Sequence, residues 1–358
     1  MKILNNLKIG DCIGICAPSA GIEKPEKQLK LDCAIKQLKE MGFNVIETES
    51  VRKDIQGRSA SKEIRAKEFL ELYLNSDVHA IIFAAGGDFL VEMLECINFD
   101  DLKNVPTKWL AGYSDITGIS FLMTTILEVP TLYTQTIKDF AMKPLHKSLE
   151  DAIKIMMGEY PIQESFEKCE KKVNMLDLLN EINPSEENTN EEVEEVVDPT
   201  EGYKLEEDVV WKNLYNEEVI ELKGRAIGGC LDVVKNLIGT KFDKVTEYID
   251  KYKEDGIVWF FDVFEFSTPE IVRTLLQFKN AGYFEHCKGI LVGRCLFLRE
   301  DYELDIAESL KQGLDGLNIP VIYDMDIGHV SPQMPIINGG KIEVKSENGK
   351  GTLRSYLD

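Results

Sequence analysis

Strand-like and helix-like segments alternate along the first third of the chain. Apolar runs at residues 12–17, 43–46, 80–84 and 108–112 fit short buried strands, and helical patterns at 28–41 and 61–75 separate them. In the first helical pattern Leu31, Ile35 and Leu38 recur on one face, and Gly42 marks its end. This alternation constrains the fold most, because it predicts a parallel sheet with helices on both faces.

The second half of the chain predicts a different sheet. Strand-like runs recur at 257–261, 289–292, 321–323 and 342–344, with a helical pattern after residue 230. Between the halves, residues 181–208 hold 12 acids and one base, so this stretch carries −11 of the net charge of −22. We therefore expect an N-terminal α/β domain at 1–165, an acidic linker or loop at 166–222 and a mixed C-terminal α/β domain at 223–358, with an active site in the cleft between the two domains.

Composition excludes several classes of function. A net charge of −22 disfavours a nucleic acid polymer as partner, because phosphate binding requires clustered basic residues. No apolar run approaches 18 residues, and the first residues show no signal-peptide core, so neither a membrane nor an export role is expected. The eight cysteines form no CxxC pair, which predicts reduced cysteines in a cytoplasmic protein rather than disulfides or a metal site.

The segment around Ser114 is the first candidate for chemistry. The apolar run 108–112 ends in a glycine, Ser114 follows two positions later, and a helical pattern then opens. A strand that turns sharply into a helix exposes the serine hydroxyl and directs the first helical N–H groups at whatever it attacks. Taken alone, the segment is more typical of a plain strand-to-helix turn capped by Ser114 or Asp115 than of a catalytic serine.

Two further segments favour the catalytic interpretation. Asp262 ends the strand-like run at 257–261, and His329 lies in a Gly-His turn after the run at 321–323. A serine, an acid and a histidine at strand ends are the parts of a nucleophile–base–orienter set. A single histidine is more often structural, so this prediction depends on the three residues together.

Several short motifs resemble, in the same order, those of the LD-carboxypeptidases and the related microcin C immunity peptidases. They lie at residues 10–19, 84–88, 112–115, 227–231, 259–262, 289–294 and 328–329. Each motif is weak alone, and their order along nearly the whole chain carries the resemblance. It implies a serine hydrolase whose triad residues follow one another along the chain in the order serine, acid, histidine. It also implies a homodimer, which is frequent in the family.

The resemblance assigns roles to residues of this chain. Ser114 would be the nucleophile and His329 the general base and acid. The family usually has a glutamate as third member, where this chain has Asp262, with Glu265 in reserve. An oxyanion needs preset donors, for which the N–H of Asp115 and the glycine turn at Gly86 and Gly87 are expected, Gly87 foremost. No metal or cofactor is expected.

The substrate is less constrained. Murein-trimming members of the family often carry an arginine where this chain has Ala85, whereas Asp88 and Phe89 look more like the immunity branch. That branch cuts an amide joining an amino acid or peptide to a nucleotide-like group. We therefore expect a small peptide or peptidyl conjugate as substrate. A murein tetrapeptide carboxypeptidase, another serine acyl-transfer enzyme and a catalytically impaired binding homologue stay open.

Overall fold

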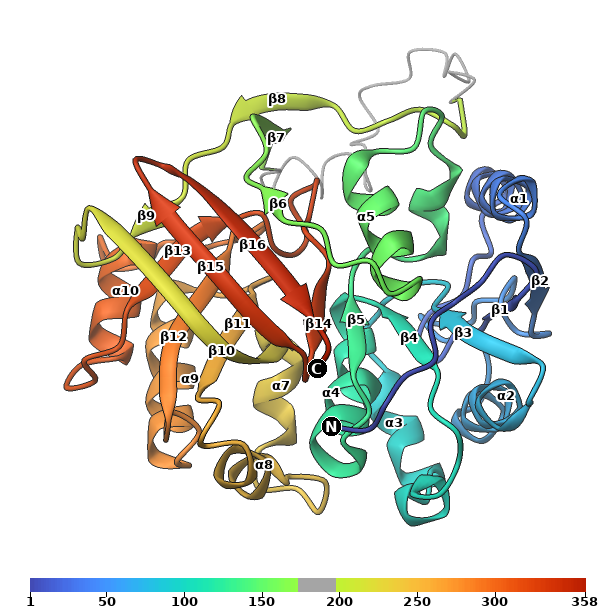
Figure 1. Cartoon of the computed structure of the whole chain (residues 1–358), viewed down its shortest axis with the longest axis horizontal. Helices are drawn as coiled ribbons and strands as arrows, with labels where there is room; N and C mark the ends of the chain where they lie inside the picture. Colours follow the sequence, from blue (N-terminus) through green and yellow to red (C-terminus); the bar gives the residue numbers. More distant parts are fainter. Residues whose placement is uncertain (173–197) are drawn as a thin grey trace, which may run out of the picture.

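The computed structural model describes residues 1–172 and 198–358, and it has two sheets that lie beside each other (Figure 1). Within the described residues the first sheet has six strands in the order β14-β5-β4-β3-β1-β2. Its strands are β1 (Cys12–Ile15), β2 (Asn44–Glu47), β3 (Val78–Ile82), β4 (Trp109–Gly112), β5 (Thr131–Tyr133) and β14 (Ile336–Asn338).

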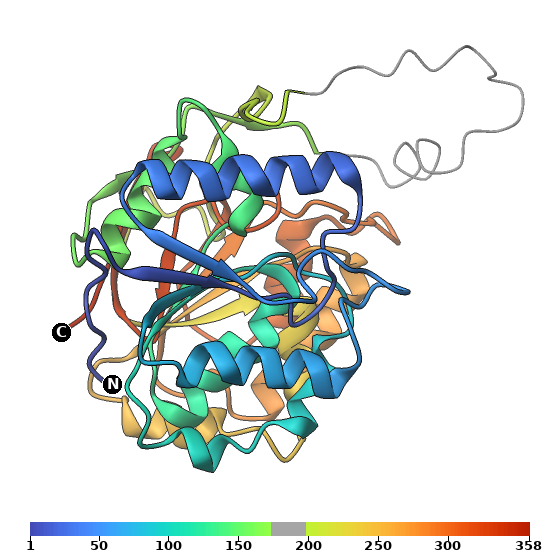
Figure 2. The ribbon, with the colours of Figure 1, turned by 90° about the vertical axis from the view of Figure 1, so that its right-hand side faces the viewer.

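The pairs among β1 to β5 are parallel, and only β14 runs antiparallel at its edge. The helices of this half are α1 (Pro25–Glu40), α2 (Lys62–Leu74), α3 (Leu90–Met93), α4 (Thr117–Leu127) and α5 (Lys147–Met156). Figure 2 shows α1 and α2 on opposite faces of the strands, as the alternating pattern predicts.

The second sheet contains eight described strands in the order β6-β16-β15-β10-β11-β12-β13-β9. They are β6 (Gln163–Glu164), β9 (Lys212–Asn213), β10 (Val219–Cys230), β11 (Ile257–Asp262), β12 (Cys287–Gly293), β13 (Val321–Met325), β15 (Lys341–Glu347) and β16 (Lys350–Tyr356). Strands β10 to β13 pair in parallel, and β15 and β16 extend the sheet in antiparallel fashion. The predicted fold class, a parallel-rich α/β half followed by a mixed α/β half, is confirmed.

Shorter elements complete the described chain. Helices α7 (Leu231–Val234), α8 (Val245–Lys251), α9 (Thr268–Asn280) and α10 (Ile306–Gly313) belong to the second half, and the strands β7 (Lys168–Glu170) and β8 (Leu205–Asp208) form a separate antiparallel pair. The 3-10 turns are η1 (Leu94–Cys96), η2 (Phe99–Leu102), η3 (Ser114–Ile116), η4 (Ile137–Ala141) and η5 (Lys235–Leu237). Most of the acidic stretch predicted as a linker lies outside the described residues, and its end is the exposed strand β8.

The halves share one hydrophobic core. Helix α4 is buried around almost its whole circumference, with only Ile126 partly exposed, and its buried hydroxyls on Thr117, Ser120 and Thr124 are hydrogen-bonded. It packs against β5 and β14 of the first sheet and against β10 and α7 of the second half. A helix buried on every side is covered by protein on every side, so α4 lies between the two halves and packs against both.

Strands also cross between the halves. Strand β14 comes from the C-terminal part of the sequence but pairs with β5 of the first sheet. Strand β6, which precedes the acidic stretch, pairs with β16 of the second sheet. The predicted domain boundaries stay a prediction, but these exchanges show that each sheet contains a strand from the other part of the sequence.

Candidate active site

Ser114 lies at a sharp turn between β4 and α4. Its φ of +64° is left-handed, a conformation that costs a residue with a side chain on the order of 1 kcal/mol. The turn η3 begins at Ser114 and continues directly into α4. A Cβ on Gly86 would lie 2.9 Å from Ser114 Oγ, so only glycine leaves the hydroxyl its space. This is the geometry of a nucleophile elbow.

His329 faces this serine from the second half. Its Nε2 lies 2.9 Å from Ser114 Oγ, a hydrogen-bond distance between residues 215 positions apart. The imidazole packs against two aromatic rings, with centroid distances of 4.9 Å to Tyr113 and 4.4 Å to Phe264. These contacts restrict the orientation of the imidazole ring.

Asp262, the last residue of β11, lies behind the imidazole and is fully buried. Its Oδ2 is 2.7 Å from His329 Nδ1, and its Oδ1 accepts the His329 backbone N–H at 3.3 Å. The Nδ1–H direction departs from the line to Oδ2, so the two atoms are in close polar contact without a linear hydrogen bond. An aspartate therefore does reach the imidazole. A Cβ on Gly328 would overlap Asp262 Oδ1, so the turn before His329 requires glycine.

Tyr133, which sequence reasoning missed, completes the contacts of this carboxylate. Its phenol donates to Asp262 Oδ2 at 2.6 Å and accepts the backbone N–H of Ser114 at 3.4 Å. Burial, followed by the Asp262 charge, raises the pKa of Tyr133 well above its usual value, so the phenol keeps the proton it donates. The only sequence signal was a tyrosine at the end of the strand-like stretch after α4, which is equally typical of a core residue.

The loop that carries His329 is held by a buried ion pair. Arg294 donates from Nη1 to Asp326 Oδ1 at 2.5 Å, and from Nη2 to the carbonyls of Val330 and Pro332 at 2.9 and 3.0 Å. The other Asp326 oxygen accepts the Trp211 indole N–H at 2.9 Å. Both ends of the loop around His329 are thus bound to one guanidinium group.

The residues predicted as oxyanion donors lie around the same cavity as the nucleophile: Asp115 follows Ser114 directly, and Gly86 and Gly87 line the cavity with it. The Asp115 backbone N is 3.6 Å from the position of a Cβ on Gly86, and a Cβ on Gly87 would overlap the Ser19 hydroxyl oxygen. The Asp115 side chain does not face the reaction. It accepts the Ser19 hydroxyl and the Leu90 N–H, and burial raises its pKa. These contacts fix the turn at Ser114 against the glycine turn.

A cavity of about 420 Å³ opens at this point, lined from the first half by Gly86, Gly87 and Ser114 and from the second by Phe264 and His329. Glu265, the reserve acid, is exposed and is not part of this arrangement; its N–H donates to Asp232. Trp109 and Trp211 are buried in the core. In the part of the chain that the structure describes, no three acid, cysteine or histidine side chains form a metal cluster.

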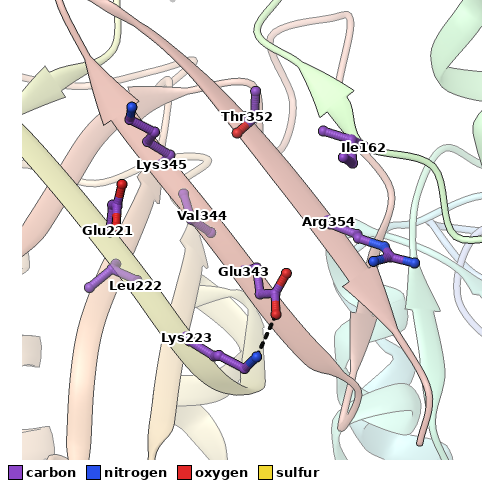
Figure 3. A pocket seen from close by; sticks show the side chains of 9 residues that line it. All are labelled: Ile162, Glu221, Leu222, Lys223, Glu343, Val344, Lys345, Thr352 and Arg354. Atoms are coloured by element: carbon purple, nitrogen blue, oxygen red, sulfur yellow. Dashed lines mark hydrogen bonds and ion pairs between the residues drawn. The ribbon is translucent and has the colours of Figure 1, made fainter.

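Another hollow, of about 490 Å³, lies on the open face of the second sheet (Figure 3). Side chains of β10, β15 and β16 line it, and Lys223 and Glu343 form an ion pair across it at 2.6 Å. It contains no histidine, serine or cysteine, so it lacks a serine–histidine pair like that of Ser114 and His329.

A serine in an elbow, with a histidine at hydrogen-bond distance and a buried carboxylate behind it, defines the class of α/β serine hydrolases. Matches to family models identify the family within that class. The LD-carboxypeptidase N-terminal domain matches residues 13–134 and the LD-carboxypeptidase C-terminal domain matches residues 223–344, so this chain belongs to the LD-carboxypeptidase family. The resemblance drawn from the motifs is confirmed, and the chain is a serine hydrolase of the peptidase type.

Individual relatives cover almost the whole chain. The microcin C7 self-immunity protein MccF of Escherichia coli is 25% identical over 346 residues, which are 96% of this chain and 92% of MccF. A probable murein peptide carboxypeptidase of Bacillus subtilis (strain 168) is 23% identical over 95% of this chain and 89% of its own length. A solved structure of MccF in complex with aspartyl sulfamoyl adenosine superposes with a TM-score of 0.73 at 21% identity and covers all of both chains.

One observation on the described residues bears on the membrane. No helix among them is both long enough and apolar enough to span a bilayer.

Proposed function

We propose that the chain hydrolyses an acyl amide near a C-terminus through an acyl-enzyme on Ser114. The observation that carries this proposal is the 2.9 Å contact between Ser114 Oγ and His329 Nε2 inside the cavity. The imidazole removes the hydroxyl proton as Oγ attacks the carbonyl carbon, and it returns that proton to the leaving amine. Water then attacks the ester by the same route.

Asp262 is proposed as the third member of the triad. Its carboxylate, 2.7 Å from Nδ1, keeps the proton on that nitrogen and stabilises the imidazolium that forms during the attack. Tyr133 is a positioning residue, because its phenol holds the carboxylate oxygen nearest the ring. The N–H groups of Asp115 and Gly87 are proposed as the oxyanion donors, each worth about 3–4 kcal/mol in the transition state.

The proposed substrate is an amino acid or short peptide joined by an amide-like bond to a nucleotide-like group. The relatives support it, because MccF has been solved in complex with aspartyl sulfamoyl adenosine and with adenosine monophosphate. A murein tetrapeptide is the second candidate, supported by the relative named as a murein peptide carboxypeptidase. A homodimer and a cytoplasmic location stay predictions.

Labelling with a fluorophosphonate, followed by mass spectrometry, tests the nucleophile. We expect a single adduct on Ser114 in the folded protein, none in Ser114→Ala, and none in urea-unfolded wild type. A catalytically impaired binding homologue would leave Ser114 unmodified in the folded state, and that result would reject the proposal.

A substrate panel then separates the candidates. Aspartyl sulfamoyl adenosine, an LD-tetrapeptide and simple esters are compared by kcat/KM. Preference for the adenosine conjugate supports the proposed substrate, preference for the tetrapeptide supports the murein alternative, and hydrolysis of esters alone favours another acyl-transfer activity.

A further inference from the structure

Three lysines line the same cavity as Ser114 and His329, and we call Lys24, Lys27 and Lys138 the lysine cluster. Lys24 immediately precedes α1, Lys27 lies in its first turn, and Lys138 lies in η4, which packs against α1. Two segments far apart in sequence thus contribute lysines to the lining of one cavity.

Among the described residues, ion pairs form at the nearby Lys36, Lys53 and Lys143, but none forms at Lys24, Lys27 or Lys138. The contrast is Lys143, which lies near the other end of α1 and pairs with Glu40 at 2.9 Å. Of the two acids that line the cavity, Asp54 already accepts backbone N–H groups at 2.9 and 3.0 Å, and Glu23 is exposed to solvent.

The charges around Lys138 do not fully compensate its own positive charge. Burial is the main cause that lowers the pKa of Lys138, and Lys27 and Lys30 lower it further, while neighbouring Asp139 opposes them. Burial also raises the pKa of Asp139, so that acid compensates only in part. A bound anion would stabilise the crowded ammonium groups through charge-assisted hydrogen bonds.

Given the proposed hydrolysis at Ser114, we propose that the lysine cluster binds an anionic group of the substrate, a carboxylate or a phosphate, while the scissile carbonyl lies at Ser114. A cavity of about 420 Å³ is within the usual range for a small molecule that fills both positions. Because the chain has a net charge of −22, it repels anionic substrates in general, and the lysine cluster offsets this repulsion locally. The cluster would select substrates by charge.

Three matched p-nitrophenyl esters test this selection: the neutral butyrate, the glutarate monoester, which adds a terminal carboxylate, and the 4-phosphonobutyrate, which adds a terminal phosphonate. We expect wild type to hydrolyse at least one anionic ester about 10-fold faster in kcat/KM than the butyrate. Lys27→Met and Lys138→Met should each lower that ratio about 10-fold, the factor expected for losing one charge-assisted contact. Lys143→Met is the control and should leave the ratio unchanged.

The preferred ester identifies the source of the anion, since the glutarate ester stands for a carboxylate and the phosphonate ester for a phosphate. Equal ratios in wild type, Lys27→Met and Lys138→Met would overturn the lysine cluster as a subsite, even if Ser114 reacts normally. If Ser114 reacts with no ester, the proposed hydrolysis fails instead, and calorimetric titration of Ser114→Ala with glutarate and inorganic phosphate decides on the cluster. The subsite is supported if either anion binds and the Lys27→Met substitution weakens that binding. It is rejected if neither anion binds, or if Lys27→Met leaves the binding unchanged.

Discussion

Replacing Arg294 by methionine tests how the His329 loop is held. The guanidinium is almost fully buried, with 5% of its side chain exposed, and its partner Asp326 is fully buried. Arg294→Met leaves the Asp326 carboxylate without its cationic partner and removes the donor from two loop carbonyls. Breaking a buried pair from one side costs about 3–5 kcal/mol, because an uncompensated charge stays behind.

Urea unfolding, followed by circular dichroism, measures the effect on the free energy of unfolding. The matched control is Arg299→Met, since Arg299 is 72% exposed and pairs with Asp301 at 3.1 Å. An exposed pair contributes about 0–1 kcal/mol, so the control should unfold close to wild type.

A second variant separates charge from packing. Arg294→Met combined with Asp326→Leu removes both charges, and it should recover part of the lost stability. Hydrolysis should stay low in both variants, because the loop that positions His329 has lost its anchor. If Arg294→Met unfolds within about 1 kcal/mol of wild type, the buried ion pair does not hold the loop as argued.

Three further predictions concern single residues. Asp262→Asn should lower kcat about 10⁴-fold by favouring the wrong imidazole tautomer while the serine stays in place; a loss below 10-fold would exclude it from the triad. Gly328→Ala should lower kcat/KM at least about 100-fold, because its methyl group overlaps Asp262, whereas Gly239→Ala, also at positive φ but with open space, should leave activity intact; equal effects would contradict the steric argument. Hydrogen bonding to Arg58 lowers the pKa of Glu92 from 4.5 to about 2, so this acid stabilises the fold above pH 4.5 and loses that contribution as the pH falls towards 2. Glu92→Gln should therefore show a smaller loss of stability over that range in urea unfolding, and an unchanged pH profile would refute the assignment.

The sequence allowed the local part of the fold to be predicted. Strand β4 and the turn at Ser114 follow from a short apolar run, a glycine and a helical pattern, all within a few residues of one another. Strand β11 and its terminal acid could be predicted from the sequence for the same reason. Such features depend on side-chain alternation and backbone preference, which neighbours in sequence largely determine.

The contacts that join distant segments could not be predicted in this way. Tyr133 meets Asp262 across 129 positions of sequence, and no local pattern distinguishes it from an ordinary core tyrosine. The placement of β14 beside β5 could not be predicted either, because a three-residue apolar strand fits the edge of either sheet. The charges that surround Lys138 among the described residues, Asp139 on one side and Lys27 and Lys30 on the other, likewise depend on which segments the fold brings together.

The exchange of β14 has a mechanical consequence. Residues 326–335 leave the second sheet at β13 and enter the first sheet at β14, so the histidine is carried on a bridge with one end fixed in each half. Any hinge motion that widened the cleft would pull on both ends of that bridge and draw the imidazole away from the serine. If release of the product required the two halves to part, that motion would disturb the same ten residues that position the imidazole for the next attack.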